Sequence, residues 1–141
     1  MPIREHPPSG SILMCDFSAG FRLPEMVKRR PVVVLSPKIR ARPGLCTVVA
    51  LSTSPPDPVM SYHCQVDFDP PLPGWMTSEG VWVKGDMVAT VGFHRLDFIS
   101  LGKSKSGKRR YYYSTLSAQN LTRIRACVLH GIGLSSLTKH L

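Results

Sequence analysis

The chain has 141 residues, the length of a single domain, and 43% of them are hydrophobic, which is enough for one modest core. Its formal net charge of +9 favours a polyanionic partner. No apolar run approaches the roughly 20 residues that cross a bilayer, no signal-peptide pattern opens the sequence, and the four cysteines form no C-x-x-C pair. We therefore expect one soluble, cytoplasmic domain over residues 1–141, with no membrane partner, zinc knuckle or redox motif.

Short apolar runs predict a mainly β protein, because turn residues, including 13 prolines and 11 glycines, separate them. Residues 31–35 (PVVVL) are rich in β-branched side chains and too few for a helix, which predicts a buried central strand. In chain order, the expected strands and apolar segments are residues 11–17, 31–35, 46–51, 63–68, 80–84 and 87–91.

A hairpin and a helix are expected toward the C-terminus. Residues 95–101 and 110–114 flank a basic loop bounded by glycines, which predicts a hairpin with a long tip. After Ser117 the apolar residues recur at helical spacing, which predicts a helix that Ser117 caps and Gly131 ends. The expected architecture is a small curled β-sheet closed by a C-terminal helix.

Basic residues are concentrated in two segments. Between Arg22 and Arg42 there are seven, opposed by Glu25 alone, and residues 103–110 hold five more. Residues 57–86, by contrast, carry five acids and one base. This clustering favours a basic face that binds nucleic acid over an evenly solvated surface.

Motifs for the common cofactor chemistries are missing from the sequence. It has no G-x-x-x-x-G-K-[ST] phosphate loop, no G-x-G-x-x-G fingerprint, no H-E-x-x-H motif and no G-x-S-x-G elbow. We therefore expect no cofactor and no metal site. The remaining candidates for chemistry are polar residues at the ends of strands.

Three segments resemble the MazF/PemK family of toxins from toxin–antitoxin systems. They are residues 10–17 (GSILMCDF), 25–36 (EMVKRRPVVVLS) and 48–53 (VVALST), which match that family in residue type, order and spacing. The most specific piece is R-P-V-V-V-L-S, followed by an apolar strand that ends in Ser or Thr. Residues 63–66 fit the family's next strand, and residues 80–96 fit it more weakly.

The resemblance implies a small SH3-like or CcdB-like β-barrel with a C-terminal α-helix, assembled as a homodimer whose RNA groove follows the subunit interface. It implies a metal-independent endoribonuclease that cuts single-stranded RNA, mRNA in particular, with a sequence bias. The reaction it implies is attack of the ribose 2′-hydroxyl on the adjacent phosphate, which DNA cannot undergo. The implied protein partner is a cognate acidic antitoxin that neutralises the enzyme.

Three residues of the resembling segments are expected to be catalytic. Arg30 precedes Pro31 in the family motif, and its guanidinium can hold two phosphoryl oxygens at any working pH. Thr53 matches a family threonine that binds phosphate or orients this arginine, although Ser52 is close enough to confuse the assignment. Glu25 is either a general base or a salt-bridge partner of Arg30.

Two histidines, His63 and His94, are further acid or base candidates, because an imidazole titrates near neutral pH. A histidine in a strand is more often structural. Several relatives carry an arginine and, three residues later, an aspartate where this chain has Ala89 and Gly92. Two interpretations stay open: His94 or the 103–110 loop supplies the missing charge, or activity is weak or lost.

RNA binding is expected to involve basic, hydroxyl and aromatic side chains. Trp75 follows a Pro-Leu-Pro-Gly turn and is expected to be exposed, where its ring can stack on an unpaired base. The residues expected to bind RNA are Lys28, Arg29, Ser52, Trp75, Lys105, Lys108 and Arg109.

Two other functions remain open for the same fold. A CcdB-like protein poisons DNA gyrase by binding it, and a non-catalytic SH3-like module binds RNA without cutting it. The combination of Arg30 with Thr53 argues against a gyrase poison, because a protein-directed poison needs no phosphate ligands at the ends of strands.

Overall fold

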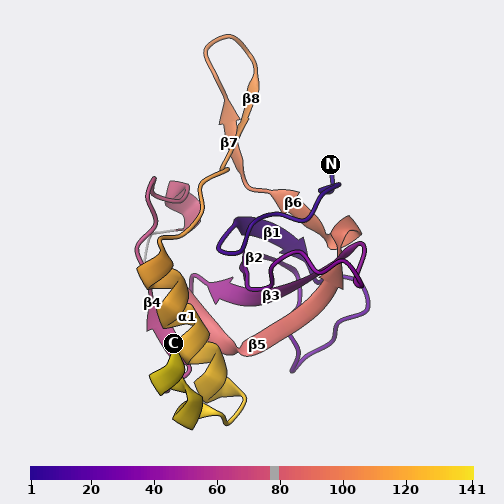
Figure 1. Ribbon diagram of the computed structural model, residues 1–141. Helices are drawn as coiled ribbons and strands as arrows, with labels where there is room; N and C mark the ends of the chain where they lie inside the picture. The colour runs from indigo at the N-terminus through magenta and orange to yellow at the C-terminus, as the bar shows by residue number, and fades with distance from the viewer. Residues whose placement is uncertain (77–79) are drawn as a thin grey trace.

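The computed structural model describes residues 1–76 and 80–141, and its central element is a six-stranded antiparallel sheet (Figure 1). The strand order in this sheet is β4–β5–β3–β2–β1–β6, and a second sheet holds β7 and β8. The strands are β1 (Ile12–Asp16), β2 (Arg29–Val34), β3 (Leu45–Ser52), β4 (His63–Gln65), β5 (Trp82–Gly92), β6 (Leu96–Phe98), β7 (Ser100–Lys103) and β8 (Arg109–Tyr111). The helices are α1 (Ala118–Gly131) and the 3-10 turns η1 (Gly74–Met76), η2 (Phe93–Arg95) and η3 (Ser135–His140).

The expected mainly β fold with a C-terminal helix is confirmed, but the sheet is not closed into the expected barrel. Its edges are β4 and β6, which lie at opposite ends of the strand order. Each of these edge strands has only 3 residues. Within the described residues β4 pairs with β5 and β6 pairs with β1, and no pairing joins β4 to β6, so the sheet is open.

The central strand β2 is buried on both faces of the sheet, as its run of β-branched residues predicts. Val32, Val33 and Val34 are consecutive in the chain and each is 0% exposed. Val33 faces an apolar cluster that includes residues of α1, whereas Val32 and Val34 face a second cluster that includes Phe17. The sheet therefore lies between two apolar layers, so polar side chains that could act on a ligand are found at the ends and edges of its strands.

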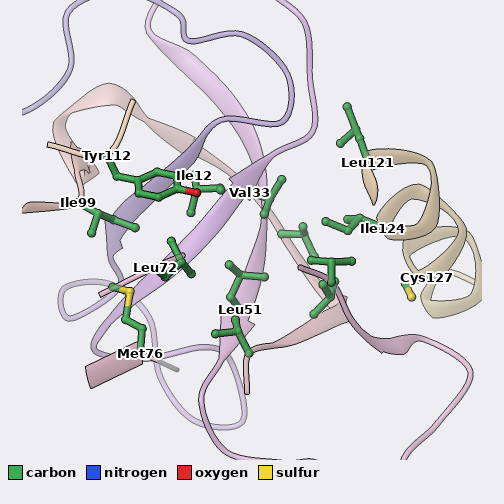
Figure 2. Close-up of a cluster of buried hydrophobic side chains, with 14 residues drawn as sticks. Ile12, Val33, Leu51, Leu72, Met76, Ile99, Tyr112, Leu121, Ile124 and Cys127 are labelled. Carbon is green, nitrogen blue, oxygen red and sulfur yellow. The ribbon is translucent and has the colours of Figure 1, made fainter. Parts of the chain in front are cut away.

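Helix α1 covers the first of these clusters. Ser117 caps it as expected, because its Oγ accepts the backbone N–H of Asn120 at 3.1 Å. The buried residues of α1 follow one another at intervals of three positions and lie on the side that packs on the strands (Figure 2); they are Leu121, Ile124 and Cys127. Among the described residues, no helix combines the length and the apolar character that a membrane crossing requires.

The helix ends at Gly131 as expected, but the glycine is needed there for a different reason. The positive φ angle that follows the helix, 78°, belongs to Gly133. A Cβ at Gly131 would lie 2.7 Å from the carbonyl oxygen of Gly85, and a Cβ at Gly85 would lie 2.6 Å from the backbone of Cys127. The two glycines therefore allow α1 to approach the backbone of β5 closely.

The two apolar segments expected at 80–84 and 87–91 belong to one strand, β5. Its pairing with β3 is irregular between Val49 and Ala50, which places a bulge around Gly85. A bulge interrupts the alternation of side chains without ending the strand. The sequence pattern therefore shows two segments where the backbone forms one.

The predicted hairpin is confirmed and forms a sheet of its own. Strands β7 and β8 pair in antiparallel fashion and project from the six-stranded sheet (Figure 1). At its tip the Ser104 N–H donates to the Lys108 carbonyl at 2.7 Å, and Gly107 has a φ of 84°. Tyr112 anchors its base, because the ring is buried and the hydroxyl donates to the carbonyl of Pro70 at 2.5 Å.

Candidate functional site

Arg30 lies at the beginning of β2, where the loop after β1 returns to the sheet. Lys28 in that loop has a φ of 69°, which is uncommon for a residue with a side chain, and its carbonyl accepts the Phe17 N–H at 2.7 Å. The half-buried Arg30 side chain donates from Nε to the Val27 carbonyl at 3.3 Å. Within the described residues its two terminal nitrogens have no partner, so they are available to an anion.

Thr53 lies directly after β3, at the same end of the sheet as Arg30. The antiparallel register of β2 and β3, continued by two residues, places Arg30 opposite Ser52. The Ser52 hydroxyl is used inside the next turn, where it donates to the Ser54 carbonyl at 3.3 Å and accepts the Ser54 N–H at 3.2 Å. Arg30 and Thr53 therefore belong to neighbouring strand ends, with Thr53 as the half-buried hydroxyl next to the turn.

Glu25 is exposed in the loop before β2, and its carboxylate accepts a backbone N–H of the same loop at 3.1 Å. It does not pair with Arg30: over residues 1–76 and 80–141, the ion pair present joins the Met1 ammonium to Asp97. Glu25 instead shares a pocket of about 150 Å³ with residues 86–89 of β5. The salt-bridge role considered for this carboxylate is therefore not the arrangement in the structure.

His63 lies on the edge strand β4, away from Arg30. Strands β5 and β3 separate β4 from β2, which is three strand spacings of about 4.8 Å each. Its Nδ1 accepts the Met60 N–H at 3.0 Å, and burial together with the Lys84 ammonium lowers the pKa of the imidazole. These contacts give His63 a local structural role in the turn before β4.

His94 is exposed in η2 and shares a pocket of about 110 Å³ with Asp16 and Arg29. It is therefore the histidine that lies at the Arg30 end of the sheet. Gly92 makes room for it, because a Cβ at Gly92 would lie 2.6 Å from the imidazole ring. Ala89 packs against the second apolar cluster. Of the two departures from the family pattern, the one at Gly92 is therefore coupled to the position of His94.

Arg95 also acts at this end of the sheet, and sequence reasoning did not single it out. Its guanidinium donates to the carbonyls of Asp16 and Ala19 at 3.0 and 2.7 Å and lies over the ring of Phe21, 4.9 Å from the centroid. These contacts fix the loop after β1. Because they join residues 79 and 76 positions apart, no local sequence signal reveals them.

A groove of about 660 Å³, here called the hairpin groove, lies between the β7–β8 hairpin and the β1–β6 edge of the sheet. Its cationic lining residues are Arg29, Lys103 and Arg109. Its one lining carboxylate, Asp97, is neutralised by the Met1 ammonium at 2.9 Å. The two basic segments of the sequence therefore meet in one groove with a positive field.

The other residues expected to bind RNA are spread around this groove. Lys28 is exposed in the loop next to Arg29, and Lys105 and Lys108 are exposed at the hairpin tip, beyond the groove lining. Trp75 belongs to the backbone of η1, but its side chain lies outside the described part of the structure. The structure thus brings Arg29 and Arg109 together, with the lysines at the periphery.

Two comparisons of the amino-acid sequence gave matches. A family model described as PemK-like, MazF-like toxin of type II toxin-antitoxin system matches residues 9–130. An uncharacterized protein from Haemophilus influenzae is 30% identical over 149 aligned positions, which cover 97% of this chain and 98% of that protein.

The fold is similar to several solved structures. An endoribonuclease from a mycobacterial species, in complex with its cognate antitoxin, has a TM-score of 0.60 at 17% identity and covers 92% of this chain and 97% of its own. MazF from Deinococcus radiodurans has a TM-score of 0.59 at 18% identity, covering 92% and 98%. The Mycobacterium tuberculosis toxin MazF-mt6 has a TM-score of 0.55 at 18% identity, covering 88% and 97%. At these identities the likeness shows the fold.

Proposed function

Because the chain belongs to the family of PemK-like, MazF-like toxins of type II toxin–antitoxin systems, we propose that it is an endoribonuclease that cuts single-stranded RNA, mRNA in particular, at preferred sequences. The observation that carries the proposal is that Arg30 and Thr53 stand at neighbouring strand ends, with two terminal guanidinium nitrogens of Arg30 that bond to no described residue. Two solved structures of similar fold are described as endoribonucleases, which supports it.

The proposed reaction is a transfer within the RNA strand. A base takes the proton of the ribose 2′-hydroxyl, the 2′-oxygen bonds to the adjacent phosphorus, and the bond from phosphorus to the 5′-oxygen breaks. An acid protonates the departing oxygen, which leaves a 2′,3′-cyclic phosphate and a 5′-hydroxyl. The Arg30 guanidinium stabilises the charge on the phosphorane, so no metal ion is required for that task.

The remaining roles in this proposal follow from position. Thr53 binds the scissile phosphate or holds Arg30 toward it. Glu25 and His94 are the candidates for base and acid, because the Glu25 carboxylate pairs with no cation in the described structure and His94 shares a pocket with Arg29. His63 is too far across the sheet to act on a phosphate held by Arg30.

A test that separates the three functions considered is incubation of the purified chain with a long RNA in EDTA, followed by sequencing of the RNA ends. The proposed ribonuclease gives discrete cuts at a recurring sequence and leaves cyclic phosphate ends. A non-catalytic RNA-binding module retards the RNA and leaves it intact. A gyrase poison does neither, and uncut, unbound RNA would therefore reject the proposal.

The proposed protein partners are a second copy of this chain and an acidic antitoxin segment that lies over the basic surface. A similar fold has been solved with its cognate antitoxin, and the net charge of +9 favours an acidic partner. We expect the isolated chain to sediment as a dimer and to lose cleavage when the partner encoded beside it is added. A monomeric mass would reject the dimer, and a partner that binds without reducing cleavage would reject the inhibitory role.

The hairpin tip is expected to hold RNA phosphates without reading bases. Lys105 and Lys108 at the tip and Arg109 at the beginning of β8 are all exposed, so replacing all three by serine should not disturb the core. For a single strand each neutralised phosphate contributes about 0.7 to the log–log salt slope. We expect the triple variant to bind RNA more weakly, to flatten that slope by up to about two units, and to keep its cut-site preference.

The matched control removes the same charge from another side of the molecule. Arg123, Arg125 and Lys139 are exposed on or after α1, and their replacement by glutamine lowers the net charge equally. If both triple variants change the salt slope alike, the tip acts only through the long-range field. If the tip variant changes the cut-site preference, the tip reads sequence.

A further inference from the structure

Three consecutive tyrosines follow the hairpin tip, and they alternate in direction. Tyr112 is 2% exposed and anchored to the core, so its two neighbours project to the other side of the strand. Tyr113 is 67% exposed, and Tyr111 lines the hairpin groove together with Arg109. The alternation therefore sends Arg109, Tyr111 and Tyr113 to the same side of the chain.

The half-buried Tyr111 and the exposed Tyr113 form an aromatic cluster with Phe98. The ring centroids of Phe98 and Tyr113 are 4.9 Å apart with an interplanar angle of 66°, and those of Tyr111 and Tyr113 are 6.2 Å apart at 56°. Edge contacts of this kind hold the rings in place and leave aromatic faces open. The exposure of Tyr113 shows that burial in the core does not explain this side chain.

Two rings of this cluster, Phe98 and Tyr111, form an aromatic wall of the hairpin groove beside its cations, and Tyr113 contacts both rings from outside the lining. Phe98, Tyr111 and Met14 give it apolar lining, and Arg29 and Lys103 give it charge. Its volume of about 660 Å³ lies in the range of small-molecule sites, roughly 300–1,000 Å³. With its carboxylate neutralised by the N-terminus, the groove suits a ligand that has one flat apolar part and one anionic part.

We infer that the hairpin groove binds one unpaired nucleotide of the RNA, with the base stacked on the Phe98, Tyr111 and Tyr113 cluster and the phosphate held by Arg29. The inference rests on the proposed function, because it assigns a base subsite to that substrate. Arg29 and Arg30 are consecutive in β2, so their side chains leave opposite faces of the strand, and the groove holds a nucleotide other than the one at the scissile phosphate. Aromatic faces grip splayed single-stranded bases in this way without requiring one particular base.

The test compares Tyr113→Leu with Tyr113→Phe. The ligand is an RNA oligonucleotide that contains the cut site and carries a single 2′-deoxy nucleotide at the scissile position, so that it is bound and not cut. Loss of one base stack should raise Kd by about 10- to 100-fold in Tyr113→Leu. Tyr113→Phe keeps the ring and should bind like the wild type. Because stacking releases no counterions, the salt slope should not change.

A second measurement uses oligonucleotides in which one base at a time is removed. For the wild type, removal of the base at one position should raise Kd as much as Tyr113→Leu does. In Tyr113→Leu, removal of that same base should raise Kd no further. The groove assignment is overturned if the wild type cuts RNA, no abasic position weakens its binding, and Tyr113→Leu binds normally. The proposed ribonuclease function would survive that result. A wild type that neither binds nor cuts RNA overturns both. Loss of antitoxin binding alone in Tyr113→Leu would assign the groove to a protein partner instead.

Discussion

Replacement of Arg30 by alanine is expected to lower the rate of RNA cleavage by about 10²- to 10³-fold, the usual effect of removing one preorganised donor at a developing oxyanion. The one hydrogen bond of its side chain in the described structure, 3.3 Å from Nε to the Val27 carbonyl, is not part of the core. The variant should therefore keep its thermal unfolding temperature. Single-turnover cleavage with saturating RNA measures the chemical step apart from binding.

Matched variants distinguish chemistry from binding. Arg30→Lys keeps the charge but loses the planar fork, so it should recover only part of the rate. Arg29→Ala removes a cation from the neighbouring residue, which lines the hairpin groove, and should weaken binding more than it slows the chemical step. Thr53→Ala should lose activity that Thr53→Ser largely restores. Cleavage by Arg30→Ala near the wild-type rate would reject this residue as the phosphate ligand.

A single 2′-deoxy nucleotide at the scissile position is expected to abolish cutting at that site. The missing hydroxyl is the nucleophile of the proposed reaction, and no group of the enzyme can replace it. The same substitution one nucleotide downstream is the control and should leave the cut intact. Mass spectrometry of the products should find the 2′,3′-cyclic phosphate. Equal rates for the two oligonucleotides would mean that water or another nucleophile attacks the phosphorus.

The parts of the fold that follow from local pattern were predicted from the sequence. The buried run in β2, the hairpin and the Ser117 cap each depend on residues close together in the chain. The bulge around Gly85 was not predicted, because Gly85 lies against the backbone of α1 and this contact joins distant segments of the chain. That the sheet stays open between β4 and β6 was also not visible in the sequence, because strand order depends on pairing between distant segments.

In the candidate site, too, some residues could be predicted from the sequence and others could not. Arg30 and Thr53 came from the family resemblance, and antiparallel pairing of β2 with β3 places them at neighbouring strand ends. The hairpin groove could not be foreseen, because it needs the hairpin to lie against the β1–β6 edge and the N-terminus to neutralise Asp97. Alternation through the three tyrosines was the one local signal that could have indicated its aromatic wall.

The β7–β8 hairpin shares no strand with the six-stranded sheet, and its tip is exposed beyond the anchor at Tyr112. Changes in the length or sequence of the tip therefore remove little buried apolar area and cost the core little stability. Insertions and substitutions can therefore be tolerated there while β2 and β3, which carry the proposed catalytic residues, stay unchanged. Variation in this peripheral element would therefore alter how strongly the proposed RNA substrate is held and leave the choice of cut site unchanged, because the tip is expected to contact phosphates and not bases.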